Sequence, residues 1–306
     1  MGKISFMYPG QASQYVGMGE DFNHAMPFAK QFYQQADDIL GFKISEISFF
    51  GPDEKLKQTN ITQPAILVHS VLITQLLKDK GIKPHIAAGH SLGEYSALVA
   101  ADAIDFESAL RIVKLRGELM HNAGSSKPGT MVAIIGLDNS AINEICTEAR
   151  TAGIVQPANF NSPGQVVISG SIPGIKKATE LAEKKGAKKI IPLSVSGAFH
   201  SPLMESAREE LADALERIEI GDAEIPVYCN VTAEPIISKQ DIKMALFKQL
   251  THPVLWEQII QNMIGDGTEI FYEVGPGRVL SGLLKRINRS AKSINVGAVD
   301  DYRNLT

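Results

Sequence analysis

Residues 89–93, Gly-His-Ser-Leu-Gly, limit how the surrounding chain can fold. They follow a short apolar run at residues 86–88 and precede a helical pattern at residues 94–103. Glycines on both sides of Ser91 allow a sharp turn without Cβ clashes, which leaves the hydroxyl exposed at the end of a strand. A helix starting there stabilises negative charge with its free N–H groups. The spacing predicts a nucleophile elbow, although Ser91 could also be a simple helix cap.

The rest of the chain alternates short apolar runs with longer helical patterns, which is typical of an α/β fold. Apolar runs at residues 4–8 and 270–274 both have the character of buried strands. We therefore expect the two ends of the chain to share one sheet. The length of 306 residues corresponds to about two domains at roughly 150 residues each.

The middle of the chain has an order of its own. Strand patterns at residues 131–135, 154–158, 166–169 and 189–195 alternate with helical patterns at residues 140–151 and 175–185. This β-α-β-β-α-β order is ferredoxin-like. The most linker-like stretch is residues 123–129, Ala-Gly-Ser-Ser-Lys-Pro-Gly. We predict a small domain at residues 126–196, inserted into a large α/β domain formed by residues 1–125 and 197–306.

Composition excludes several classes of protein. With 30 Lys and Arg against 34 Asp and Glu, the net charge of −4 argues against a nucleic-acid or membrane-surface binder. No apolar run reaches the ~18 residues of a membrane span. The chain has two cysteines, Cys146 and Cys229, and no Cys/His cluster for a zinc site. Sparse cysteine suits a reducing compartment, so we expect a cytoplasmic enzyme.

An acyl-transfer serine needs a general base, and the chain offers seven histidines. His69 lies in an apolar helical pattern and is a core candidate. His200 stands just before a helix start at Ser201-Pro202. Because the dipole of a helix N-terminus disfavours the imidazolium, His200 should stay neutral, as a base must. His200 is therefore the preferred base.

Such a serine also needs an oxyanion hole. The backbone N–H of Leu92, directly after Ser91, is one natural donor. The loop at residues 9–14 offers a second donor if the first strand neighbours the elbow strand. Gln11 is the candidate there, its alternative being an ordinary polar loop residue.

Arg116 stands on the apolar face of the predicted helix at residues 106–120, among Ile112, Val113, Leu119 and Met120. A buried unpaired charge is costly, so the guanidinium must have a partner. That partner is either a carboxylate of the sheet, in a structural salt bridge, or a substrate carboxylate held bidentately.

These segments resemble the malonyl-CoA:acyl carrier protein transacylases of fatty acid synthesis. The resemblance covers essentially the whole chain, in the order of that family. It rests on YPGQASQ at residues 8–14, GHSLGEYSA at 89–97, Arg116-Gly117, NFNSPGQVV at 159–167, AFH at 198–200 and YEVGPG at 272–277.

The resemblance implies a hydrolase-like large α/β domain with a parallel sheet core and an inserted ferredoxin-like α+β small domain. It also implies a Ser91–His200 dyad in which a backbone carbonyl around Gln249 orients the histidine. Arg116 would hold the malonyl carboxylate, and the N–H groups of Gln11 and Leu92 would form the oxyanion hole.

Two further residues are expected at the substrate, Phe199 and Met120. In related acyltransferases a Leu after the nucleophile and a Phe before the histidine accompany malonyl rather than methylmalonyl units, and Leu92 and Phe199 fit that pattern. The expected reaction is ping-pong, through a malonyl-serine, from malonyl-CoA to the phosphopantetheine thiol of acyl carrier protein. Coenzyme A is released, and neither a cofactor nor a metal is expected.

Carrier proteins of this kind are acidic, so a basic docking face is expected on a chain that we take to be a monomer. Two clusters qualify, Lys184, Lys185, Lys188 and Lys189 in the small domain, and Lys285, Arg286, Arg289 and Lys292 near the C-terminus. Either cluster could instead be a solvated face. Two other functions share the motifs, a thioesterase or esterase and a non-catalytic carrier-protein or CoA-binding module. An arginine on an apolar face favours the transacylase, and an intact serine–histidine pair argues against the binding module.

Overall fold

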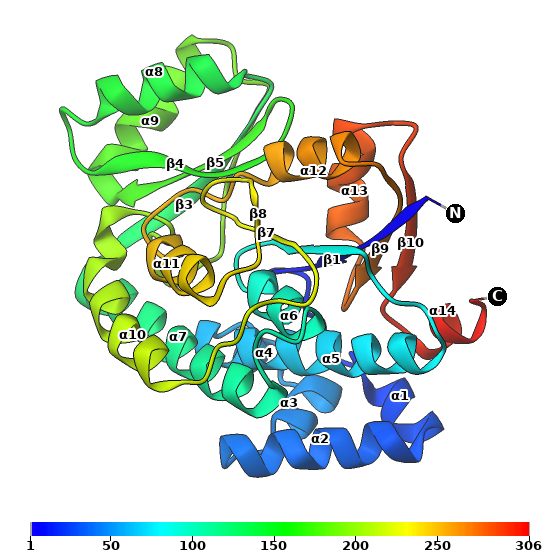
Figure 1. Cartoon of the computed structure of the whole chain (residues 1–306). Coiled ribbons are helices and arrows are strands. Elements are labelled where there is room, and N and C mark those ends of the chain that lie inside the picture. The colour runs from blue at the N-terminus through cyan, green and yellow to red at the C-terminus, as the bar shows by residue number, and fades with distance from the viewer. Residues whose placement is uncertain (1, 306) are drawn as a thin grey trace.

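The computed structural model describes residues 2–305, so the two terminal residues of the predicted large domain, 1 and 306, lie outside it. Two sheets organise the chain (Figure 1). The central sheet has the strand order β10-β9-β1-β2-β7-β8, and a smaller sheet has the order β4-β5-β3-β6. This is the predicted α/β class with a second, antiparallel α+β unit.

Parallel strands form nearly all of the central sheet. Strand β1 (Lys3–Tyr8) pairs in parallel with β2 (Ile86–Gly89) and with β9 (Thr268–Val274). The two ends of the chain therefore share one sheet, as predicted. Strands β10 (Lys292–Val296) and β7 (Val227–Tyr228) extend it in parallel, and β8 (Pro235–Ile236) closes one edge antiparallel to β7.

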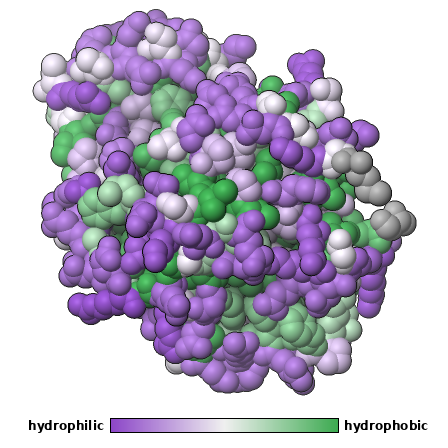
Figure 2. Space-filling model, in the orientation of Figure 1, coloured by the Kyte–Doolittle hydropathy of each residue, from purple (hydrophilic) through white to green (hydrophobic). Residues whose placement is uncertain are grey.

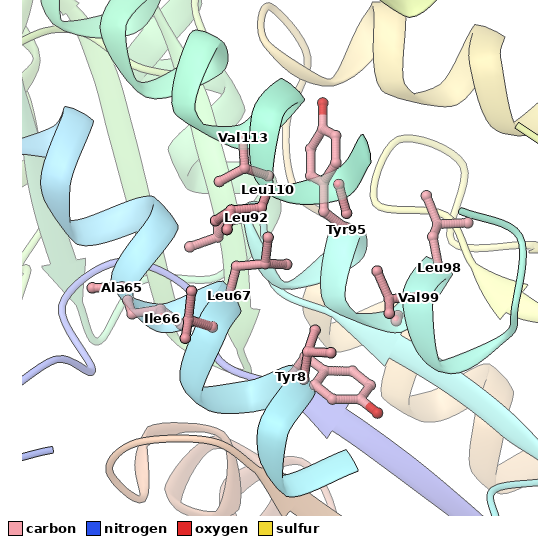
Figure 3. Packing of buried hydrophobic residues seen from close by; sticks show 14 of the residues in the cluster. Tyr8, Ala65, Ile66, Leu67, Leu92, Tyr95, Leu98, Val99, Leu110 and Val113 are labelled. Atoms are coloured by element: carbon pink, nitrogen blue, oxygen red, sulfur yellow. The ribbon is translucent and has the colours of Figure 1, made fainter. Parts of the chain in front are cut away.

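Helices cover both faces of this sheet, and β1 shows why its run is mostly apolar instead of alternating. Phe6 and Tyr8 belong to the main core with α5 (Thr59–Asp79), α6 (Gly93–Ala100) and α7 (Phe106–Ser126). Met7, pointing to the opposite face, packs with α12 (Trp256–Gly265) and α13 (Val279–Ile287). Successive side chains of a strand face opposite sides, so a strand covered on both faces is mostly apolar. Ser5, which is buried, is the exception in β1. Figure 3 shows Leu67, Leu92 and Leu110 in the main core, from the region of α5, α6 and α7.

Hydrophilic side chains cover most of the face seen in Figure 2, with hydrophobic ones gathered near its centre. The remaining helices surround the core. They are α1 (Glu20–Ala25), α2 (Pro27–Leu40), α3 (Ile44–Phe50), α4 (Asp53–Leu56), the 3₁₀ turn η1 (Pro202–Met204), α10 (Glu205–Arg217), α11 (Lys239–Gln249) and α14 (Val299–Arg303). Across residues 2–305, none of the helices has both the length and the apolar character needed to cross a membrane.

The smaller sheet forms a lobe at the upper left of Figure 1. Its strands β3 (Gly129–Ile135), β4 (Val155–Ser162), β5 (Gln165–Ser171) and β6 (Lys189–Pro192) pair antiparallel. Helices α8 (Asn139–Ala149) and α9 (Ile172–Lys184) share with it a separate core that includes Val132, Ile134 and Ile168. The β-α-β-β-α-β order and the ferredoxin-like topology are as predicted.

The predicted linker at residues 123–129 is wrong for most of its length. Helix α7 continues to Ser126, and β3 begins at Gly129. Gly124 is a site of close contact: a Cβ there would lie 2.1 Å from the Ser196 carbonyl oxygen. The chain that returns from the lobe therefore packs directly against α7, and the lack of a side chain at Gly124 allows this close contact. The exact limits of the small domain, residues 126–196, stay a prediction.

Candidate active site

Ser91 lies in a left-handed turn at the carboxyl end of β2, with φ of 51°. Its flanking glycines are needed for steric reasons. A Cβ on Gly89 would lie 1.8 Å from the Gly93 carbonyl carbon, and one on Gly93 would lie 2.1 Å from the Tyr8 carbonyl oxygen. The predicted strand–turn–helix elbow is thus present, with α6 starting two residues after Ser91.

Asn230 ties this elbow to the neighbouring strand. Its Oδ1 accepts a hydrogen bond from the Ser91 N–H at 2.7 Å, and its Nδ2 donates to the Gly89 carbonyl at 2.6 Å. Asn230 is fully buried and follows β7. Since both sides of the turn bond to one amide, the asparagine restrains the left-handed conformation of Ser91.

His200 is within hydrogen-bond distance of the serine. Ser91 Oγ lies 2.9 Å from His200 Nε2, and His200 Nδ1 lies 2.8 Å from the Gln249 carbonyl oxygen. A carbonyl can only accept, so Nδ1 carries the proton and the neutral ring presents an unprotonated Nε2 to the hydroxyl. Gln249, expected near the histidine, contacts it through this carbonyl.

Burial, followed by the nearby Arg116 charge, lowers the pKa of His200 to about 3. The histidine is thus neutral, as the sequence predicted, but for a different reason. The helix that follows it begins as the short 3₁₀ turn η1, and the dominant cause is desolvation rather than a helix dipole.

Arg116 is fully buried and points to the same serine. One terminal nitrogen, Nη2, lies 3.0 Å from Ser91 Oγ and 2.8 Å from Gln249 Oε1, and Nη1 lies 2.7 Å from Gln63 Oε1. Burial lowers the pKa of its guanidinium. Within residues 2–305 it forms no salt bridge, so the structural ion pair considered for it is not found there. A cation bonded only to neutral groups is suited to a carboxylate brought by a ligand.

Two backbone donors of this region have no partner in the described part of the chain. The N–H groups of Leu92 and Gln11 form no hydrogen bond within residues 2–305. Strands β1 and β2 are neighbours, and Gly10 packs so closely on the elbow that a Cβ there would lie 2.4 Å from the His90 carbonyl oxygen. The Gln11 side chain is held by Thr59, at 3.3 Å.

A pocket of about 320 Å³ opens over these groups. Seven of the eight sequence-predicted site residues line it, namely Gln11, Ser91, Leu92, Arg116, Met120, Phe199 and His200. Gln249 is outside the lining and lies behind it, bonded to His200 and Arg116. The pocket lies between the two units of the chain: the loops that follow β1 and β2 of the central sheet line one side, and Met131 of β3 and Asn159 of β4 of the smaller sheet also line it. Within the described part of the chain, no group of three or more His, Cys, Asp or Glu side chains could hold a metal ion.

Buried polar residues of the site that sequence reasoning missed include Gln63, Asn230 and Glu94. The last two had a usable signal. Asn230 follows the apolar residues 227–229, near the end of a strand pattern, and the carboxyl ends of parallel strands meet at one edge of a sheet. Glu94 is a charged residue in a helix that is otherwise mostly apolar, the same pattern that singled out Arg116.

Comparison with known proteins shows the family of the chain. Residues 5–300 match the family described as "Acyl transferase domain". A malonyl CoA-acyl carrier protein transacylase of Bacillus subtilis (strain 168) is 46% identical over 97% of this chain and 94% of its own length. An acyl carrier protein S-malonyltransferase structure from Vibrio cholerae O1 biovar eltor has a TM-score of 0.96 and 42% identity, covering 99% of this chain and 100% of its own. A malonyl-transacylase solved in complex with its type II PKS acyl-carrier protein has a TM-score of 0.95 and 42% identity, covering 98% of each chain.

Proposed function

The chain belongs to the acyl transferase domain family, within the malonyl CoA-acyl carrier protein transacylases, and we propose that it transfers malonyl groups from malonyl-CoA to acyl carrier protein through a malonyl-Ser91 intermediate. Its relatives carry this activity in their names, and a similar enzyme is solved in complex with its carrier protein. The transfer would supply fatty acid synthesis.

One observation carries the proposal. Ser91 Oγ contacts a neutral base, His200 Nε2 at 2.9 Å, and a buried cation, Arg116 Nη2 at 3.0 Å. An esterase for neutral acyl groups needs the first contact and has no use for the second. A nucleophile beside a buried arginine is suited to an acyl group that ends in a carboxylate.

In the first half-reaction, His200 Nε2 takes the proton of Ser91 as Oγ attacks the thioester carbonyl of malonyl-CoA. The developing oxyanion is stabilised by the N–H groups of Leu92 and Gln11, and Arg116 turns to the free malonyl carboxylate. When the intermediate collapses, the carbon–sulfur bond breaks and the thiolate of coenzyme A takes the proton back from His200. A malonyl ester of Ser91 remains.

In the second half-reaction, the pantetheine thiol of the carrier protein enters the same pocket. His200 accepts its proton, the sulfur attacks the ester carbonyl, and the ester carbon–oxygen bond breaks to return the proton to Ser91. Phe199 and Met120, both on the pocket wall, limit the space around the acyl chain. This fits malonyl better than a branched unit.

For carrier-protein docking, we propose the first basic cluster. Lys184, Lys185, Lys188 and Lys189 are all exposed, although Lys185 pairs with Glu144 at 2.6 Å. Strand β6 begins at Lys189 and ends at Pro192, and the chain that follows it, Leu193, Ser194 and Val195, lies on the pocket wall. An acidic protein bound there would have its prosthetic group close to Ser91. The paired variant Lys188→Glu/Lys189→Glu should raise the KM for carrier protein and leave malonyl loading unchanged.

We further propose that the enzyme works as a monomer in the cytoplasm. Cys146 and Cys229 are both buried free thiols, which suits a reducing compartment. Light scattering after size-exclusion chromatography tests the monomer, and a dimer mass would contradict it.

The decisive experiment is an intact-mass measurement. The protein is mixed with malonyl-CoA, and then with holo acyl carrier protein, with Ser91→Ala as the control. We expect a malonyl adduct that persists in water, is absent from the control, and moves to the carrier protein when it is added. Rapid loss of the adduct without carrier protein would identify a hydrolase, and the absence of any adduct would identify a binding module.

A further inference from the structure

Glu94 is a fully buried carboxyl group one helical turn after Ser91. Its Oε2 accepts hydrogen bonds from Gln249 Nε2 at 2.7 Å and from the Asn230 backbone N–H at 3.2 Å. Its Oε1 has no partner among residues 2–305. No step of the proposed transfer uses this group, although burying a carboxylate without full hydrogen bonding is costly.

Both partners of Glu94 hold groups of the active site. The Gln249 side chain accepts from Arg116 at 2.8 Å, donates to the Ser91 carbonyl at 2.9 Å, and its own backbone carbonyl orients His200. The Asn230 amide holds the Ser91 turn on both sides. Oε2 of Glu94 therefore bonds to the two residues, Gln249 and Asn230, that hold the nucleophile, the base and the arginine in place.

This inference rests on the proposed function. We propose that Glu94 is a positioning residue of the transfer reaction: its carboxylate fixes Gln249 and Asn230 in the orientations that the nucleophile, the base and the arginine require. Loss of either hydrogen bond would let these supports move, and misplacement by about 1 Å can cost roughly 100-fold in rate.

The geometry favours the ionised form of Glu94. Two donors converge on Oε2, which suits a negatively charged oxygen. If Oε1 carried a proton, that O–H group would have no acceptor among residues 2–305. Burial raises the pKa of Glu94 to about 7, against the opposing effects of the Gln249 and Asn230 hydrogen bonds and the Arg116 charge. The titratable and charged groups that face it are Arg116 on α7, Tyr95 on α6 and Cys229 after β7.

Protonation of Glu94 should make the rate of acylation depend on pH. As the pH falls through about 7, Glu94 takes up a proton and its hydrogen bonds to Gln249 and Asn230 weaken. Acylation should therefore slow in this range. His200, whose pKa is lowered to about 3, does not titrate there.

The test uses two isolated changes and a matched control. Glu94→Gln keeps an acceptor oxygen but cannot ionise, whereas Glu94→Ala removes the acceptor. Glu273→Gln is the control, because Glu273 is also a fully buried carboxylate of the central sheet but bonds to the start of α13, at the Leu280 and Ser281 N–H groups. Circular dichroism checks that each variant is folded.

Two rates are measured between roughly pH 5.5 and pH 9. The first is labelling of Ser91 by a fluorophosphonate, which needs the serine and its base but no acyl substrate. The second is formation of the malonyl adduct. We expect both wild-type rates to fall below about pH 7, the Glu94→Gln rates to lack this fall, and Glu94→Ala to be roughly 100-fold slower throughout. Glu273→Gln should keep the wild-type profile.

The proposal is wrong if Glu94→Gln retains the wild-type fall or if Glu94→Ala labels at the wild-type rate. If Glu94→Ala does not fold, the pH profile of Glu94→Gln decides alone. If wild-type protein is labelled by the fluorophosphonate but forms no malonyl adduct, the proposed function fails, and the labelling profile still decides the role of Glu94.

Discussion

Ser91 and His200 both have left-handed backbone conformations, with φ of 51° and 56°, while their side chains meet at 2.9 Å. Non-glycine residues rarely adopt this region, and such strain persists only where the surrounding structure enforces it. For Ser91 the enforcing groups are the flanking glycines and Asn230. For His200 they include the Gln249 carbonyl on its ring and the Gln156 amide, which donates to its backbone carbonyl at 2.8 Å.

Because the backbone packs so closely around this turn, we predict that the elbow does not tolerate a side chain at Gly93. In Gly93→Ala the new Cβ would lie 2.1 Å from the Tyr8 carbonyl oxygen, a backbone atom of the central sheet. We expect the free energy of unfolding to fall by about 1–3 kcal/mol, as for other overpacked sites, and Ser91 acylation to slow. Chemical denaturation and the intact-mass assay measure the two effects.

Gly282→Ala is the control for that change. Gly282 lies inside α13, and a Cβ there has no neighbour within 4 Å. Alanine is the better helix former by about 0.5–1 kcal/mol, so stability should rise slightly. Equal effects of the two substitutions would show that close packing at the elbow is not what requires Gly93.

Arg116 should discriminate between acyl groups. In Arg116→Ala we expect malonyl loading to fall by roughly 10- to 150-fold, the equivalent of about 1.5–3 kcal/mol for hydrogen bonds to a charged group, with little loss of acetyl loading. Arg111→Ala is the control, because Arg111 is an exposed arginine of the same helix that pairs with Glu107. The two acyl-CoA substrates are compared by intact mass. If both loading rates fell equally, Arg116 would not act through the substrate carboxylate.

Asn230 should matter to both stability and rate. Asn230→Ala leaves the Ser91 N–H and the Gly89 carbonyl without their partners, and leaving a buried polar group unsatisfied costs about 1–3 kcal/mol. We expect a lower unfolding midpoint and slower fluorophosphonate labelling of Ser91. Unchanged labelling in a destabilised variant would mean that Asn230 supports the fold alone and has no part in orienting the serine.

The sequence predicted the parts of the site that depend on local pattern. The spacing of glycines around Ser91 and the apolar neighbours of Arg116 are both visible in a few residues. The neutrality of His200 was predicted, but its cause, burial beside Arg116, depends on contacts between distant segments. Asn230 and Glu94 each had a local signal, but their shared role arises only where β2, β7 and α11 meet, which no local pattern shows. The linker prediction was wrong because glycine marks close backbone contact as well as flexibility, and Gly124 is a case of the former.

His200 should make the stability of the fold depend on pH. The pKa of His200 is lowered from its model-peptide value of 6.5 to about 3, so the unfolded chain binds more protons than the folded one between these values. The neutral ring therefore contributes stability that is fully present above about pH 6.5 and is lost as the pH falls toward 3. His200→Gln should lose less stability over this range than the wild type, as measured by urea denaturation at a series of pH values. His24→Gln, which removes an exposed histidine, is the control. Identical slopes for His200→Gln and the wild type would mean that His200 titrates alike in the folded and unfolded chains, and the burial argument for its neutrality would fail.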